Sequence, residues 1–159
     1  MKFLGKSIAP ILIVICCCVL AVSCGENREV QCTKLTELVT KGNDLIDSQK
    51  NRNDLATTKK LANNLNSTAK QLENLNLTDS NLKEFQQQSV KSFREIGQAL
   101  GDIGKALEAG NRAPTSREGQ EQIQTAQVNI AKAGKRANQA AQSQDTVTEK
   151  LIDYCKADR

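Results

Sequence analysis

The chain contains no histidine and no tryptophan, and its 159 residues include only three phenylalanines and one tyrosine. Without histidine, the usual general base, the commonest zinc ligand and every Ser-His or Cys-His dyad are missing. Basic residues occur singly or in pairs, so neither a phosphate-binding stripe nor a base-stacking platform is present. We therefore expect a protein that is not an enzyme, holds no metal ion or cofactor and binds no nucleic acid.

Helix breakers are scarce as well. Pro10 and Pro114 are the only prolines, whereas alanine, glutamine, leucine, lysine and glutamate are abundant. This composition favours helix over strand, and no alternating pattern of apolar and polar residues competes with it. The expected fold class is all-α.

The first segment has the features of a signal peptide. It carries two positive charges, Lys2 and Lys6, and no acid appears before Glu26. Residues 8–22 are apolar apart from Pro10, but this run is shorter than the roughly 20 residues that cross a bilayer as a helix. We therefore expect residues 1–23 to be a cleaved signal peptide and the protein to be exported.

The end of this segment, Ala21-Val22-Ser23-Cys24, resembles the lipobox of bacterial lipoproteins, although the family usually has leucine where this chain has Ala21. The resemblance implies that Cys24 becomes the N-terminus and carries acyl chains such as palmitate. Two chains suffice for a stable anchor on the extracytoplasmic side of a membrane. The same residues also suit an ordinary signal peptidase, so a secreted or periplasmic soluble protein is the alternative.

Beyond a short polar tether at residues 24–29, helical periodicity predicts one helical-bundle domain over residues 30–157. Apolar residues recur every three or four positions in segments at about 30–50, 53–77, 79–110 and 116–156. The third segment shows the pattern most fully, with Leu82, Phe85, Phe93, Ile96, Leu100, Ile103 and Leu107. We expect an antiparallel four-helix bundle with coiled-coil-like packing.

Capping residues support these limits. Thr78-Asp79-Ser80 can cap the third helix, and Gly110 can end it in the left-handed conformation. Thr115 with Glu118 three residues later predicts a capping box for the fourth helix. The boundary at residues 50–53 is weaker because it lacks glycine and proline, so three long helices remain an alternative.

Two cysteines can brace the domain. Once the signal peptide is removed and Cys24 is acylated, only Cys32 and Cys155 remain, in a compartment where disulfides persist. Both lie on inner faces, one at the start of the first helix and one at the end of the last. Four helices place these ends at the same pole, whereas three place them at opposite poles. A disulfide between Cys32 and Cys155 therefore favours four helices.

Three glycines interrupt the third helix, although each costs about 1 kcal/mol relative to alanine. Gly97, Gly101 and Gly104 lie on one stripe, and we expect them to form a helix-packing seam. The seam should face the small residues of the fourth helix, namely Ala126, Ala133, Gly134, Ala137 and Ala141. A hinge or a ligand groove is the alternative.

Two functions remain compatible with these features. The first is a membrane-anchored, non-catalytic interaction or structural module of the cell envelope, whose protein partner the sequence leaves unknown. The second is a carrier of a small apolar ligand in the bundle core. Small residues in the seam close space between helices, so the sequence favours the interaction module.

Overall fold

The computed structural model describes residues 26–48 and 54–157. These residues form four helices and no strand: α1 (Arg28–Asp47), α2 (Leu55–Glu73), α3 (Ser80–Asn111) and α4 (Arg117–Lys156). The predicted all-α four-helix bundle is confirmed, and the alternative of three long helices is wrong. The predicted signal peptide, the predicted acylation site Cys24 and the weak boundary at residues 50–53 lie outside the described residues.

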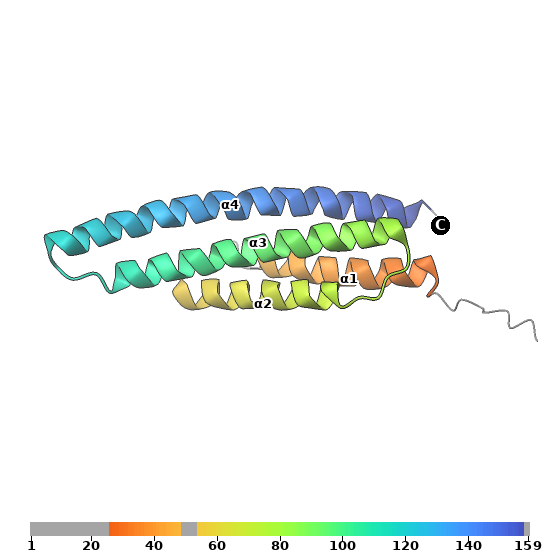
Figure 1. Cartoon of the computed structure of the whole chain (residues 1–159), viewed down its shortest axis with the longest axis horizontal. Coiled ribbons are helices and arrows are strands. Elements are labelled where there is room, and N and C mark those ends of the chain that lie inside the picture. Colours follow the sequence, from red (N-terminus) through yellow and green to blue (C-terminus); the bar gives the residue numbers. More distant parts are fainter. Residues whose placement is uncertain (1–25, 49–53, 158–159) are drawn as a thin grey trace, which may run out of the picture.

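Consecutive helices run in opposite directions along an elongated rod (Figure 1). The helix α3 packs against α2 on one side and against α4 on the other, while α1 completes the bundle over part of its length. The start of α1 and the end of α4 meet at one end of the rod, which we call the disulfide pole. The opposite end, where α3 turns into α4, is the distal end.

Each helix begins at a polar cap. The side chains of Asp54 and Asp79 accept hydrogen bonds from the third backbone N–H group beyond them, both at 2.9 Å, so the predicted cap of α3 is confirmed. Asn27 accepts from the backbone of Glu29, and α1 therefore starts at Arg28, within the predicted tether.

At the distal end the caps differ from the prediction. Ser116, not Thr115, caps α4 by accepting from the backbone N–H of Gly119 at 3.2 Å. The expected capping box is therefore wrong. Gly110 remains inside α3, which continues to Asn111, and no described glycine has a positive φ. The turn after α3 therefore forms without a glycine in the left-handed conformation.

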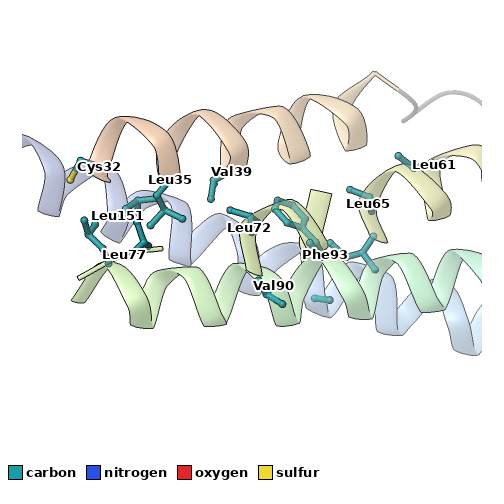
Figure 2. Packing of buried hydrophobic residues seen from close by; sticks show 14 residues of the cluster. Cys32, Leu35, Val39, Leu61, Leu65, Leu72, Leu77, Val90, Phe93 and Leu151 are labelled. Carbon is teal, nitrogen blue, oxygen red and sulfur yellow. The ribbon is translucent and has the colours of Figure 1, made fainter. Parts of the chain in front are cut away.

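All four helices contribute to the core near the disulfide pole (Figure 2). Its fully buried side chains include Leu35, Leu65, Leu72, Phe93 and Leu151. Burying such a side chain stabilises a fold by about 1.5–3 kcal/mol. The ring of Phe93 lies directly against the backbone of Gly42 in α1, where a Cβ atom would overlap the ring. The sequence pattern did not single out Gly42, which makes room for the largest side chain of the core.

Candidate functional site

The inward stripe of α4 becomes steadily more exposed toward the distal end. Positions seven residues apart lie on nearly the same side of a helix. Along this stripe Leu151 is 0% exposed and Gln144 1%, whereas Ile123 is 41% exposed. Ala137 and Ile130, between them, are half-buried. The stripe is thus covered near the disulfide pole and uncovered at the distal end.

The uncovered part begins where α1 ends. Asn43 of α1 donates to the hydroxyl of Thr148 in α4 at 3.1 Å, which sets the register of the two antiparallel helices. Only four more residues of α1 follow before it ends at Asp47. With 20 residues in α1 and 40 in α4, about half of α4 has no α1 beside it. Figure 1 shows α3 and α4 projecting past the two shorter helices.

An apolar groove of about 550 Å³ occupies this vacant corner of the bundle. Its floor consists of Leu100, Ile103 and Leu107 of α3, all half-buried. These three residues were predicted to lie on the inner face of the third helix. They do face inward, but no fourth helix covers them at this level, so they form the floor of a groove.

The walls of the groove carry no charge. Leu61 and Thr57 of α2 form one side, and Ile130, Gly134 and Ala137 of α4 form the other. Nothing lies within 4 Å of a Cβ atom built on Gly134, so this wall is open as well as small. An uncharged groove with aliphatic walls favours an apolar or amphipathic occupant.

The glycine stripe of α3 faces a different helix from the one predicted. A Cβ atom on Gly97 would lie 3.2 Å from the carbonyl oxygen of Ala62, and one on Gly104 would lie 3.3 Å from the Lys59 side chain. Both neighbours belong to α2, so the seam joins α3 to α2 and not to α4. Gly101 has no atom within 4 Å of such a Cβ and takes no part in the close contact.

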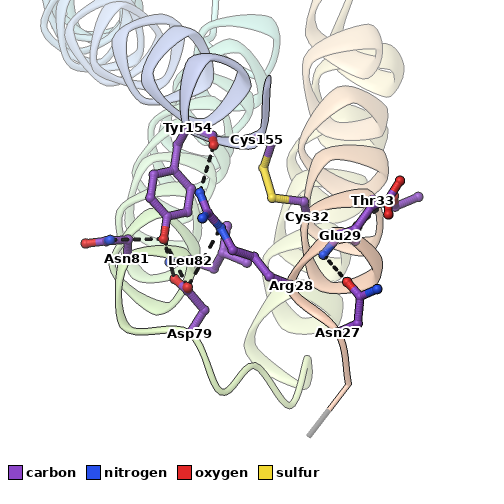
Figure 3. The surroundings of a disulfide bond; sticks show 10 residues. All are labelled: Asn27, Arg28, Glu29, Cys32, Thr33, Asp79, Asn81, Leu82, Tyr154 and Cys155. Carbon is purple, nitrogen blue, oxygen red and sulfur yellow. Dashed lines mark hydrogen bonds and ion pairs between the residues drawn. A yellow bond between two sulfur atoms is a disulfide. The ribbon is translucent and has the colours of Figure 1, made fainter. Parts of the chain in front are cut away.

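At the disulfide pole, Cys32 is bonded to Cys155, with their Cα atoms 5.8 Å apart (Figure 3). Beside it, Arg28 stacks over the ring of Tyr154 at 3.9 Å from its centroid and donates to that residue's carbonyl oxygen at 3.0 Å. The Tyr154 hydroxyl in turn donates to the carboxylate of Asp79. This cluster joins the first turn of α1, the cap of α3 and the last turns of α4.

The carboxyl of Asp79 is held in its charged form. Burial raises the pKa of Asp79, but the hydrogen bonds from the Leu82 N–H and the Tyr154 hydroxyl outweigh burial. Arg28, whose Nε lies 4.0 Å from the carboxylate, acts in the same direction. The pKa consequently lies below its ordinary value of 3.8.

A buried glutamine holds the turn between α2 and α3. Gln31, 2% exposed, accepts from the backbone N–H groups of Thr78 and Asp79 at 2.7 and 3.2 Å. Its amide nitrogen donates to the Thr78 hydroxyl at 2.8 Å and to the carbonyl of Glu26. This residue was missed in the sequence, where the only signal was a glutamine next to Cys32 on the inner face of a helix.

A second buried glutamine has a polar atom without a hydrogen-bond partner. Gln144, 1% exposed, donates to the hydroxyls of Thr148 at 3.2 Å and Ser89 at 3.4 Å. Its Oε1 atom is buried and accepts no hydrogen bond. This polar layer marks the level at which α1 ends and the groove begins.

In the described residues, no group of three or more histidine, cysteine, aspartate or glutamate residues is placed to hold a metal ion. A larger depression of about 820 Å³ runs along α1; Thr33, Glu37 and Asp44 lie among its lining residues, together with Leu45, Ile152 and the disulfide, and most of its surface is apolar. Within the ranges described, no helix is both long enough and apolar enough to span a membrane.

Comparison with protein-family models, curated proteins and solved structures finds no match to this chain. Functional inference therefore depends on the groove and the disulfide pole themselves.

Proposed function

We propose that this protein is a membrane-anchored, non-catalytic interaction module of the cell envelope, and that the groove receives a helix. The observation that carries the proposal is the uncovered inner stripe. Leu100, Ile103 and Leu107 continue the buried face of α3, yet they are left half-exposed where α1 ends. Amphipathic helices bind to grooves of this kind through apolar side chains at helical spacing.

The anchor is supported by the sequence at the start of the chain. Cys24, the cysteine of the lipobox-like motif, precedes the first helical residue, Arg28, by only four positions. Acyl chains on Cys24 hold the disulfide pole close to the membrane surface, because so short a tether spans at most about 14 Å. The groove then lies on the part of the rod farther from that membrane.

The non-catalytic character is supported by composition and by the groove lining. The chain has no histidine, and the groove lining contains neither a carboxylate nor a cationic side chain. Its polar members are Thr57, Thr58 and Asn138, which supply hydrogen bonds but no general base. A surface of this chemistry suits binding.

Site-specific photo-crosslinking in native membranes tests the proposal. A photoreactive amino acid in place of Leu107 should yield a crosslink to a polypeptide, because this position lies on the floor of the groove. The matched control carries the same amino acid in place of Gln139, an exposed residue on α4 outside the groove, and should give none. Absence of a polypeptide adduct at Leu107, or equal adducts at both positions, would contradict the proposal.

The carrier of a small apolar ligand is the second candidate function. The volume of the groove, about 550 Å³, lies within the range of small-molecule sites, and its lining is aliphatic. The same crosslinking experiment separates the two functions. A small-molecule adduct at Leu107, detected by mass spectrometry of the intact chain without a polypeptide adduct, supports the carrier and excludes the helix-docking function.

A further inference from the structure

The apolar groove is about three helical turns long. Along α4 its lining extends from Ala141 to Ile130. Along α3 it extends from Ile96 to Leu107. Each stretch covers roughly 17 Å of helix at 1.5 Å per residue. Ile46, in the last turn of α1, lines the end near the disulfide pole, which we call the inner end. The outer end lies toward the distal end of the rod. A helix in the groove therefore needs an apolar stripe of about three turns.

The four described helices offer no such stripe to another molecule. Their exposed large apolar side chains are Val30, Ile123 and Val128. Val30 lies on α1, whereas Ile123 and Val128 point in directions roughly 140° apart around α4. The other large apolar side chains of these helices are buried or half-buried in this chain. A second copy of the described residues thus lacks the surface that would fill the groove.

We infer that the groove receives an amphipathic helix of a different protein, which continues the line of α1 and runs in the same direction as α1. The inference rests on the proposed helix-docking function and adds the direction of the docked helix. The N-terminus of this helix faces the last turn of α1. Its apolar stripe lies on the groove floor, formed by Leu100, Ile103 and Leu107.

The order of the helices favours this direction. The walls of the groove belong to α2 and α4, which both run from the distal end toward the disulfide pole (Figure 1). The helix α1 is antiparallel to both of them. A docked helix that runs in the same direction as α1 is therefore antiparallel to both walls, as in an up-down-up-down bundle. The reverse direction would make it parallel to both.

Charge at the inner end favours the same direction. The C-terminus of a helix carries a partial negative charge, and its N-terminus a partial positive charge. The last turn of α1 contains Asp47 and no basic residue. Asp145 of α4 is exposed near the same level, because Asn43 of α1 is bonded to Thr148 of α4. These negative charges attract the N-terminus of a docked helix, and a lysine or arginine in its first turn strengthens the attraction.

An acidic residue at the outer end has a different effect. Asp54 caps α2 and accepts a hydrogen bond from the backbone N–H of Thr57 at 2.9 Å. Its charge is therefore matched by the positive N-terminus of its own helix. Asp47 instead adds to the negative end of α1. The inner end is consequently the end that attracts the N-terminus of a docked helix.

Mapped photo-crosslinks in native membranes test the direction. A photoreactive amino acid replaces Ala141 at the inner end in one variant and Ile130 at the outer end in another. Mass spectrometry then locates both attachment points in the partner's sequence. The point reached from Ala141 should lie nearer the partner's N-terminus. It should precede the point reached from Ile130 by about 11 residues, the number in about 16 Å of helix.

A charge reversal tests the contact at the inner end. Asp145→Lys should lower the yield of the Ala141 crosslink about threefold, because the new positive charge repels the N-terminus of the docked helix. Glu149→Lys is the matched control. It makes the same change at an exposed position of α4 one turn nearer the disulfide pole, outside the groove, and should leave the yield unchanged.

The outcomes separate this inference from the docking function. Attachment points in the reverse order, or only about five residues apart as in an extended strand, would overturn the direction or the helical form of the occupant. An unchanged yield with Asp145→Lys would overturn the contact with the end of α1. Adducts to a second copy of this chain would overturn the different protein. If neither position gives a polypeptide adduct, the docking function fails as well.

Discussion

Buried glutamines show how hydrogen-bond satisfaction sets the effect of a single residue. Gln31 and Gln144 are almost equally inaccessible, at 2% and 1% exposed. Gln31 uses both atoms of its amide, whereas Gln144 leaves Oε1 without a donor. An unsatisfied buried polar atom costs about 1–3 kcal/mol, while a satisfied one contributes to stability. We therefore expect these two residues, of the same type and burial, to contribute differently to stability.

Substitution by methionine, which has a similar volume, should reveal the difference. Gln31→Met should lower the free energy of unfolding by about 2–3 kcal/mol, because the backbone N–H groups of Thr78 and Asp79 lose their acceptor. Gln144→Met should leave it unchanged or raise it by up to about 1 kcal/mol. Urea denaturation followed by circular dichroism measures both. A loss at Gln144 as large as that at Gln31 would contradict this account.

Asp79 should make the stability of the disulfide pole depend on pH. Its pKa in the folded state is below the ordinary value of 3.8, so its charged form stabilises the fold above that value. This contribution disappears as the pH falls through the lowered pKa. Asp79→Asn should therefore lower the free energy of unfolding by roughly 1 kcal/mol at neutral pH.

The free energy of unfolding of the wild type and of Asp79→Asn should be measured between pH 7 and pH 2. This range includes the pH values at which carboxyl groups titrate. The difference between the two proteins should shrink as the pH falls below 3.8. A difference that stays constant over this range would show that Asp79 acts through shape alone, without its charge.

At the scale of a helix, glycine has a different role at each position. Gly42 of α1 leaves room for the ring of Phe93, and Gly97 of α3 lies close to the backbone of α2. Gly101 has open space around it. Helical spacing placed Gly97, Gly101 and Gly104 on one stripe, but only the packed helices show which of them has a neighbour.

Alanine substitution should separate these roles. Gly101→Ala should raise the free energy of unfolding by roughly 0.5–1 kcal/mol, because alanine is the better helix former and meets no atom there. Gly42→Ala should lower it by about 1–3 kcal/mol, since its methyl group overlaps Phe93. Chemical denaturation provides the comparison. Equal effects of the two substitutions would show that α1 is packed differently.

At the scale of the whole molecule, the disulfide connects the two ends of the domain. Cys32 and Cys155 are 123 positions apart, and closing so long a loop restrains the unfolded chain by somewhat over 4 kcal/mol, about the value for a 100-residue loop. The core is small, because leucine, isoleucine, valine and phenylalanine make up only 26 of residues 24–159. The crosslink is therefore a large part of the net stability.

Removing the disulfide should lower the melting temperature markedly. Reduction and Cys32→Ser should have similar effects, and the double variant with Cys155→Ser should be no less stable than either single one. Thermal melts combined with non-reducing peptide mapping test this. Free thiols at both positions in protein taken from its native compartment would contradict the pairing.

The anchor is tested at the N-terminus. Mass spectrometry of the protein from its native membranes should find an acylated Cys24 as the first residue. In detergent partitioning, the protein should enter the detergent phase. Cys24→Ser should release it, since about 0.8 kcal/mol of membrane affinity is lost for each methylene no longer buried. An unmodified N-terminus, or wild-type protein in the soluble fraction, would indicate ordinary secretion.

The sequence by itself determined the helices and their approximate limits. Apolar spacing over residues 79–110 and 116–156 agrees with α3 and α4 to within a residue or so at each end. The disulfide between Cys32 and Cys155 was also predicted, from the expected export of the chain, the inner-face positions of both residues and an even number of helices. Periodicity and capping are local features that depend on neighbouring residues. The relative direction of the first and last helices depends only on the number of helices.

Only the tertiary structure decided which stripe meets which neighbour. Leu100 and Leu72 both occupy inner-face positions, yet Leu72 is fully buried while Leu100 lines a groove, because α1 reaches one level of the rod and not the other. In the same way, the glycines of α3 face α2 and not α4. The spacing of apolar residues shows which side of a helix faces inward. Whether a neighbouring helix covers that side depends on the lengths and relative positions of the helices, which contacts between distant residues determine.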